Sequence, residues 1–94
     1  MIRRTDANQK LLVNQIRKIP NVSVFTTHTI GKGFPDIVIG YKGFNYLIEI
    51  KDGEKSKSQK KLTEAEELFH FDWNGQVDIC ENLSDILSLL KICS

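Results

Sequence analysis

Two acidic residues and a lysine give this sequence its clearest chemical signal. Asp36 begins one β-rich run, and Glu49 and Lys51 end the next. Neighbouring carboxylates repel each other, and a charge within an apolar strand is costly unless something neutralises it. A divalent cation would do so, because Mg²⁺ prefers carboxylate and water oxygens and can activate a water against a phosphate ester. These residue types therefore fit metal-dependent phosphodiester hydrolysis.

The expected hairpin brings the charged groups together. The runs 36–41 and 44–51 are separated by a Lys-Gly turn, and pairing of the residues beside that turn places Asp36 opposite Glu49. Opposed residues share a sheet face, with Cβ atoms roughly 4.5–5.5 Å apart. Strand alternation puts Lys51 on the same face as Glu49. The alternative is a structural hairpin in which Lys51 forms a salt bridge with Glu49, and the spacing alone fits both. The opposite face of the second strand would carry Tyr46, Ile48 and Ile50.

Three helices are expected around these strands. Apolar residues at helical spacing predict the first helix over residues 7–19. A capping box that begins at Thr63 and ends at Glu66 predicts a second helix, to about residue 71. Asn82 is a suitable N-cap for a third. The apolar residues that define the first and third helices are Leu12, Ile16 and Ile19, and Leu83, Leu87 and Leu90, respectively.

Two further β-rich segments complete the expected order of elements. Residues 22–29 precede a Gly-Lys-Gly break, residues 52–62 are polar and predicted to be a loop, and residues 76–80 form a short strand candidate. The order is therefore α-β-β-β-α-β-α. We predict an α/β fold with a mixed central sheet flanked by helices.

Length and composition favour one small domain. The chain has 94 residues, of which 40% are hydrophobic, so residues 1–94 are predicted to form a single domain. A domain of this size buries a modest share of its surface, which favours self-association. The N-terminus is polar, and no apolar run approaches the ~18 residues that span a bilayer. Cys80 and Cys93 lack a metal-type spacing and are expected to be free thiols in an intracellular, cytoplasmic protein.

Lysines crowd the segment that follows the hairpin, although the net charge of the chain is only +1. A solvated loop is the ordinary interpretation of such a segment. Its position directly after the acidic residues raises phosphate binding as the alternative. The candidates for DNA binding are Lys55, Lys57, Ser58, Lys60 and Lys61.

The run Gly33-Phe34-Pro35-Asp36, followed by Glu49-Ile50-Lys51, resembles the PD-(D/E)xK nuclease superfamily and, within it, the VRR-NUC family. The resemblance is to the small stand-alone members, which are often virus-borne. It covers nearly the whole chain and extends to Arg4, Asp6, Asn8, Gly31, Asp52, Gly53, Ser58, Leu62, Thr63, Trp73 and Gly75. It implies a restriction-endonuclease-like α-β-β-β-α-β core with a C-terminal helix added, Mg²⁺ as cofactor with Mn²⁺ able to substitute, and DNA cleavage. Similarity to homodimeric Holliday-junction resolvases makes a branched DNA the expected substrate.

The resemblance also implies residue roles. Asp36, Glu49 and the backbone carbonyl of Ile50 would bind the metal, Lys51 would be the catalytic lysine, and Gln59 matches a further polar catalytic position loosely. Many relatives carry a glutamate on the first helix, where this chain offers Asp6, Asn8 and Gln9. Asp6 fits an N-cap as well as a ligand, and the number of metal ions stays open.

Two alternatives to an autonomous nuclease remain. One is a non-catalytic module that binds nucleic acid, and the other is a nuclease subunit that needs a partner for specificity. Neither His28 nor His70 belongs to a Cys/His cluster that would favour zinc. Trp73 is expected to pack in the core rather than to stack on a base.

Overall fold

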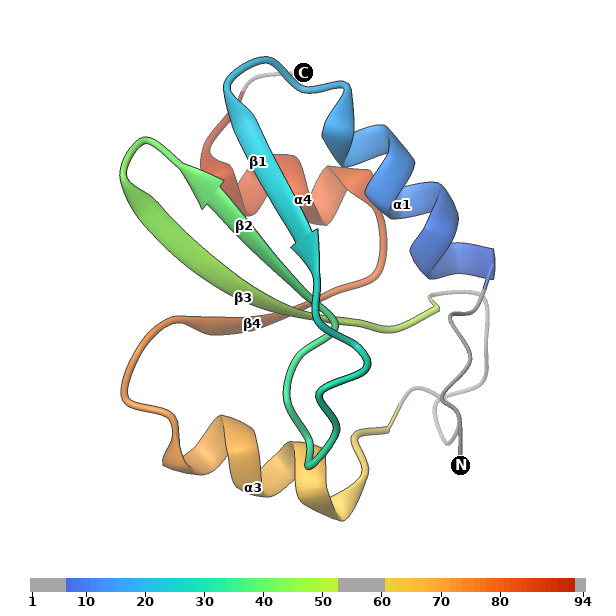
Figure 1. The fold of residues 1–94 in the computed structure, drawn as a ribbon, viewed down its shortest axis with the longest axis vertical. Helices are drawn as coiled ribbons and strands as arrows, with labels where there is room; N and C mark the ends of the chain where they lie inside the picture. The colour runs from blue at the N-terminus through green and yellow to red at the C-terminus, as the bar shows by residue number, and fades with distance from the viewer. Residues whose placement is uncertain (1–6, 53–60, 93–94) are drawn as a thin grey trace.

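The computed structural model describes residues 7–52 and 61–92, and its elements follow the predicted order. Three consecutive strands follow the first helix, and a helix, a strand and a last helix complete the chain (Figure 1). Their bounds are α1 Ala7–Arg17, β1 Val22–Thr26, β2 Ile37–Tyr41, β3 Phe44–Ile50, α3 Glu64–Asp72, β4 Val77–Cys80 and α4 Leu83–Leu90.

The four strands form one mixed sheet in the order β1-β2-β3-β4. β1, β2 and β3 are antiparallel neighbours, whereas β4 runs parallel to β3. Helices α1 and α4 pack on one face, and α3 lies on the other side (Figure 1). The coarse prediction of a mixed sheet flanked by helices is therefore confirmed.

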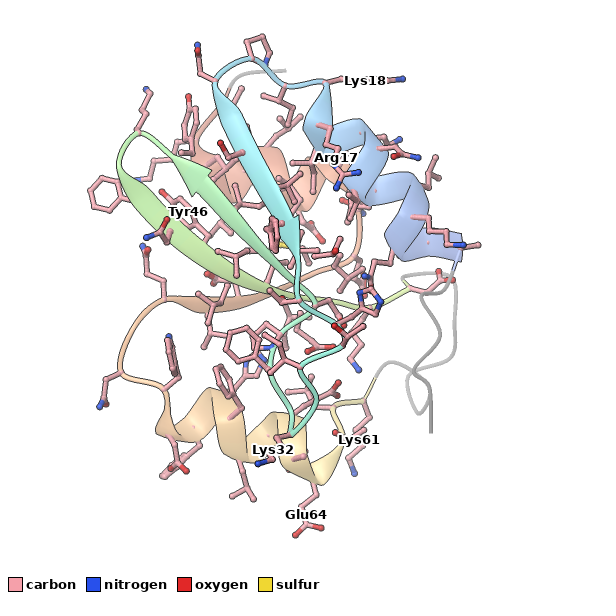
Figure 2. The ribbon with its side chains drawn as sticks, in the orientation of Figure 1. Arg17, Lys18, Lys32, Tyr46, Lys61 and Glu64 are labelled. Carbon is pink, nitrogen blue, oxygen red and sulfur yellow. The ribbon has the colours of Figure 1, made fainter. Side chains whose placement is uncertain are left out.

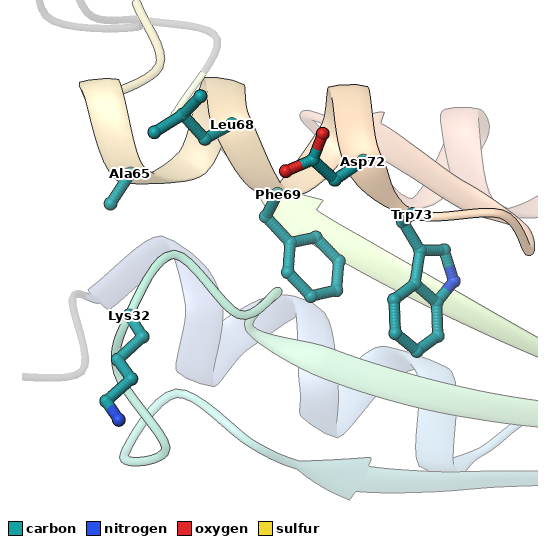
Figure 3. A pocket seen from close by; sticks show the side chains of 6 residues that line it. All are labelled: Lys32, Ala65, Leu68, Phe69, Asp72 and Trp73. Atoms are coloured by element: carbon teal, nitrogen blue, oxygen red, sulfur yellow. The ribbon is translucent and has the colours of Figure 1, made fainter.

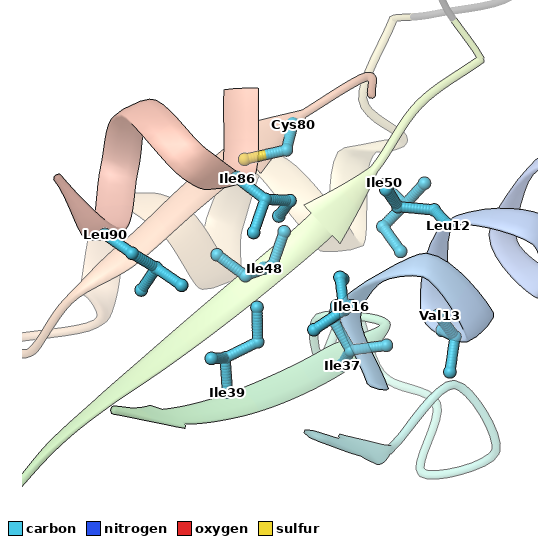
Figure 4. Packing of buried hydrophobic residues seen from close by; sticks show 10 residues of the cluster. All are labelled: Leu12, Val13, Ile16, Ile37, Ile39, Ile48, Ile50, Cys80, Ile86 and Leu90. Atoms are coloured by element: carbon cyan, nitrogen blue, oxygen red, sulfur yellow. The ribbon is translucent and has the colours of Figure 1, made fainter. Parts of the chain in front are cut away.

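The hydrophobic core fills the space between the sheet and the helices α1 and α4 (Figure 4). Ile48 and Ile50 point into it from β3, which confirms the predicted alternation along that strand. Cys80 lies in the same core as a free thiol, and burial raises its pKa to about 12. The remaining buried members are Leu12, Val13, Ile16, Ile37, Ile39, Ile86 and Leu90.

The buried face of α4 differs from the predicted leucine stripe. Ile86 and Leu90 are its fully buried residues, and Leu83 is partly buried against the core. These positions are three and four residues apart, so they follow one side of the helix. Leu87 lies one residue beyond Ile86, about 100° around the axis, and is only half-buried.

The segment between β1 and β2 turns earlier than its β-rich sequence predicts. β1 ends at Thr26, and the backbone N–H of Ile30 donates to the carbonyl of Thr27 in a turn. Gly33 then adopts a φ of 80°, and a Cβ atom there would collide with the backbone carbonyl of Ala65. This glycine therefore lets the segment that leads to Asp36 pack directly on α3.

The helix caps follow the sequence signals. Thr63 and Glu66 form the predicted capping box at the start of α3, and Asn82 caps α4 by accepting from the backbone N–H of Asp85. None of the helices over residues 7–52 and 61–92 has the length and apolar character needed to cross a membrane.

Candidate active site

Backbone groups hold Asp36 at the open end of the β2–β3 hairpin, away from its turn. The register of β2 and β3 is the predicted one, but the ladder ends at the pair Ile37 and Ile48, one residue before Asp36. The N–H of Asp36 donates to the Ile48 carbonyl at 2.9 Å, and its carboxylate accepts from the Ile50 N–H at 2.8 Å. Asp36 thus lies beyond the ladder rather than in a regular pair with Glu49. Its side chain is fixed and buried.

Glu49 is the most unusual ionisable group of the described residues. The residue is 2% exposed, and Oε1 is buried without a hydrogen-bond partner among those residues. Burial raises its pKa to about 10, and the carboxyl groups of Asp36 and Glu66 raise it further in the same direction. Without a cation, Glu49 therefore holds a proton at neutral pH.

Lys51 lies on the same side of the sheet as Glu49, as strand alternation predicts. Its Nζ is 3.8 Å from Oε2 of Glu49 and 3.0 Å from Oε1 of Glu66. Glu66, rather than Glu49, is therefore its closer partner. The expected contact between Lys51 and Glu49 is present, but the shorter contact of Lys51 is with Glu66 on α3.

Glu66 is a site residue that the sequence identified only as part of a helix cap. Its Oε1 accepts from the Thr63 N–H at 2.9 Å as well as from Lys51, and the residue is 7% exposed. Burial acts to raise the pKa of Glu66, but hydrogen bonds from Thr63 and Lys51 outweigh it, so the pKa lies below its ordinary value. Glu66 thus stays ionised and holds the lysine beside Glu49.

The start of α1 approaches the same region. Asn8 donates from Nδ2 to the carbonyls of Lys51 and Glu81, at 3.5 and 3.4 Å. Gln9 is buried, and its Nε2 lies 3.3 Å from Nδ1 of His28. The Asn8 amide therefore contacts the backbone of the charged cluster, whereas the Gln9 amide contacts His28. Asp6, the third residue considered there, lies outside the described residues.

Several other predicted site residues also fall outside the described part of the chain. Lys61 is described and is exposed at the start of the segment that leads into α3. The segment 53–60 is not described, so the expected roles of its members stay predictions. These members are Lys55, Lys57, Ser58, Gln59 and Lys60.

Aromatic side chains attach α3 to the segment before Asp36. Phe69 stacks on Trp73 with ring centroids 5.0 Å apart, and Phe34 meets Phe69 edge-on at 5.2 Å. Trp73 nevertheless stays 42% exposed, so its expected burial is only partly realised. A hollow of about 400 Å³ lies beside it, lined by Lys32, Ala65, Leu68, Phe69, Asp72 and Trp73 (Figure 3).

The carboxylates of Asp36 and Glu49 have the chemistry expected of a site for a hard cation. Among residues 7–52 and 61–92, no group of three or more His, Cys, Asp or Glu side chains is arranged to hold a metal ion. Among these residues the candidate site has only two such side chains, Asp36 and Glu49, together with the backbone carbonyl of Ile50, so it falls below that number. The buried oxygen of Glu49, unpartnered beside Asp36, fits a cation that supplies the missing positive charge. No protein-family model, curated protein or solved structure matches this chain.

Proposed function

We propose that this chain is a Mg²⁺-dependent endonuclease that hydrolyses DNA phosphodiester bonds. The observation that carries the proposal is Glu49, a buried carboxyl group with an unpartnered oxygen that lies against Asp36 and 3.8 Å from the Lys51 amine. Perturbed carboxyl groups next to a fixed cation are typical of active sites. A restriction-endonuclease-like core and membership of the VRR-NUC family are part of the same proposal, supported by the sequence motif.

Each residue of the cluster has a defined task in this proposal. The backbone N–H of Ile50 orients the Asp36 carboxylate, and Glu49 provides the second carboxylate once its proton is lost. These two groups and the Ile50 carbonyl would hold the metal, which when bound supplies Lewis acidity toward water and phosphate oxygen. Lys51, fixed by Glu66, places an ammonium group where it can orient the attacking water or neutralise charge developing on the phosphate.

The expected substrate is a branched DNA, with a four-way junction as the first choice. This part of the proposal is supported by the resemblance to junction resolvases. Two strands must be cut at such a junction, so two active sites and a homodimer would be needed. A protein that remains a monomer while it cuts junctions symmetrically would contradict the dimer.

Cleavage assays with matched lysine variants test the proposal. Labelled four-way junction, flap, single strand and linear duplex are incubated with Mg²⁺, Mn²⁺ or EDTA. We expect metal-dependent cleavage that falls at least about 100-fold in Asp36→Ala and in Lys51→Ala. Lys18→Ala, which removes an exposed lysine directly after α1, is the control and should retain activity.

The outcomes separate the proposed enzyme from its alternatives. Cleavage that continues in EDTA, or that persists in both variants, would contradict the mechanism. Binding of folded protein to DNA without cleavage under any metal condition would favour a non-catalytic module. Cleavage that appears only after addition of cell extract would favour a subunit that requires a partner.

The role of Glu66 can be tested without disturbing the helix cap. Glutamine also serves at the third position of a capping box, so Glu66→Gln keeps the cap but removes the charge that holds Lys51. We expect kcat to fall about tenfold or more with little change in KM or Tm. Glu67→Gln removes a charge from the same helical turn and is the control. A proportional loss of Tm and kcat in Glu66→Gln would show a structural role only.

A further inference from the structure

A second hollow lies between α1 and the end of β1, apart from the acidic cluster. Its volume is about 360 Å³. Most of the residues that line it carry a polar or cationic group. Those on α1 are Gln9, Lys10, Asn14 and Arg17, those from the other side are Thr26 and His28, and Val13 adds an apolar side chain.

Within residues 7–52 and 61–92, no acidic group neutralises the positive charge in this hollow. Lys10 and Arg17 are seven residues apart on α1, so they share a face at a separation of about 10 Å along the helix axis. None of the described residues that line the hollow is acidic, and Ala7–Arg17 contains no Asp or Glu. Neither cation forms an ion pair with another described residue. An anion with more than one charged group would complement this arrangement.

Residues next to the hollow form hydrogen bonds with the proposed active site. His28, in its wall, follows Thr27, whose backbone N–H donates to the Asp36 carbonyl at 2.8 Å and whose hydroxyl donates to the Pro35 carbonyl at 2.8 Å. On the α1 side, Gln9 lines the hollow, and the preceding residue, Asn8, contacts the Lys51 carbonyl. These contacts place the hollow close to the proposed active site, as a polymer bound at both places would require.

We propose that this hollow binds the sugar-phosphate backbone of the DNA strand next to the scissile phosphate. Arg17 and Lys10 contact two phosphates of that strand, and Asn14 donates a hydrogen bond between them. A guanidinium group offers several donors to one phosphate, and two cations that start about 10 Å apart along the helix can contact different phosphates of one strand. This inference rests on the proposed function, since it names how the same enzyme would hold its substrate.

Salt-dependent DNA binding tests the inference without requiring cleavage. The dissociation constant of a labelled four-way junction and of a linear duplex is measured in EDTA over a range of salt concentrations. Each of Lys10→Ala and Arg17→Ala is expected to reduce the slope of log K against log salt by about 0.7–0.9, alike for all sequences. Asn14→Asp places a negative charge in the hollow and is expected to weaken binding to both DNAs.

The matched control is Lys18→Ala. Lys18 follows Arg17 directly but points away from the molecule (Figure 2), so its removal changes the net charge equally without altering the hollow. An unchanged slope in the Lys10→Ala, Arg17→Ala double variant, or an equal loss in Lys18→Ala, would overturn the inference. Dissociation of a dimer by the double variant, measured by sedimentation, would also overturn it by assigning the hollow to an interface between copies.

The measurements of binding and cleavage distinguish failure of this inference from failure of the proposed nuclease function. Protein that binds DNA through these cations but never cuts it would support the inference and contradict the nuclease. Protein that cuts DNA with the wild-type salt slope in the double variant would support the nuclease and contradict the inference. Absence of DNA binding by the folded wild-type protein would contradict both.

Discussion

Replacement of Glu49 with glutamine is expected to stabilise the metal-free protein while it abolishes cleavage. Glutamine has nearly the same shape but no ionisable group, and its amide can donate to the acidic side chains nearby. The buried carboxyl group is costly because its pKa is raised to about 10 by burial, then by Asp36 and Glu66. We expect the free energy of unfolding of Glu49→Gln to exceed that of the wild type by about 1–3 kcal/mol near pH 8. Each kcal/mol should raise Tm by roughly 4–8 °C.

The sign of this effect follows from proton binding. The ordinary pKa of Glu49 is 4.5, and its folded-state value is about 10, so between these values the folded state binds more protons than the unfolded state. Stability of the metal-free wild type should therefore fall as pH rises through this window. In Glu49→Gln this contribution is absent, so its stability advantage should grow with pH.

Thermal unfolding in EDTA and in Mg²⁺ measures both effects. Mg²⁺ should raise the Tm of the wild type and leave that of Glu49→Gln nearly unchanged, because one of the two carboxylate ligands is gone. Glu67→Gln, on the exposed side of α3, should behave as the wild type. A Glu49→Gln variant that is less stable than the wild type in EDTA, or that still cuts DNA, would contradict the assignment of Glu49 as a metal ligand.

The part of the site built by the hairpin was predictable from sequence. Alternation and the Lys-Gly turn determine the register of β2 and β3, and with it the shared face of Glu49 and Lys51. The same reasoning assumed that the ladder continues past Ile37, whereas it ends there, although Asp36 and Glu49 are neighbours as predicted. Whether a strand pairs at its last residue depends on tertiary hydrogen bonds, here from Thr27, which a strand pattern does not contain.

The contribution of α3 was not predictable in the same way. Thr63 and Glu66 gave a correct helix start, because a capping box is a local signal. That Glu66 also binds Lys51, fifteen residues earlier, depends on how α3 docks on the segment around Gly33. The clash that any Cβ at Gly33 would make with Ala65 appears only once the two segments are placed together. Long-range docking of this kind is set by packing, not by the pattern of either segment.

The affinity of the protein for Mg²⁺ is expected to rise about tenfold per pH unit between roughly pH 6 and 9. The cation must displace the proton that Glu49 retains up to a pKa of about 10, so binding is coupled to release of one proton over this range. Titration calorimetry in two buffers of different ionisation enthalpy measures the number of protons released, and Mn²⁺ serves as a second probe. Glu66→Gln should retain most of this proton release. Glu66 is already ionised in the wild type through its bonds to Thr63 and Lys51, so it has no proton to release.

Binding that is independent of pH, with no proton released, would mean that the cation avoids Glu49. Release of about one proton per bound cation would instead identify Glu49 as a ligand. A carboxyl group that does not bind the metal keeps its proton whether or not the metal is bound.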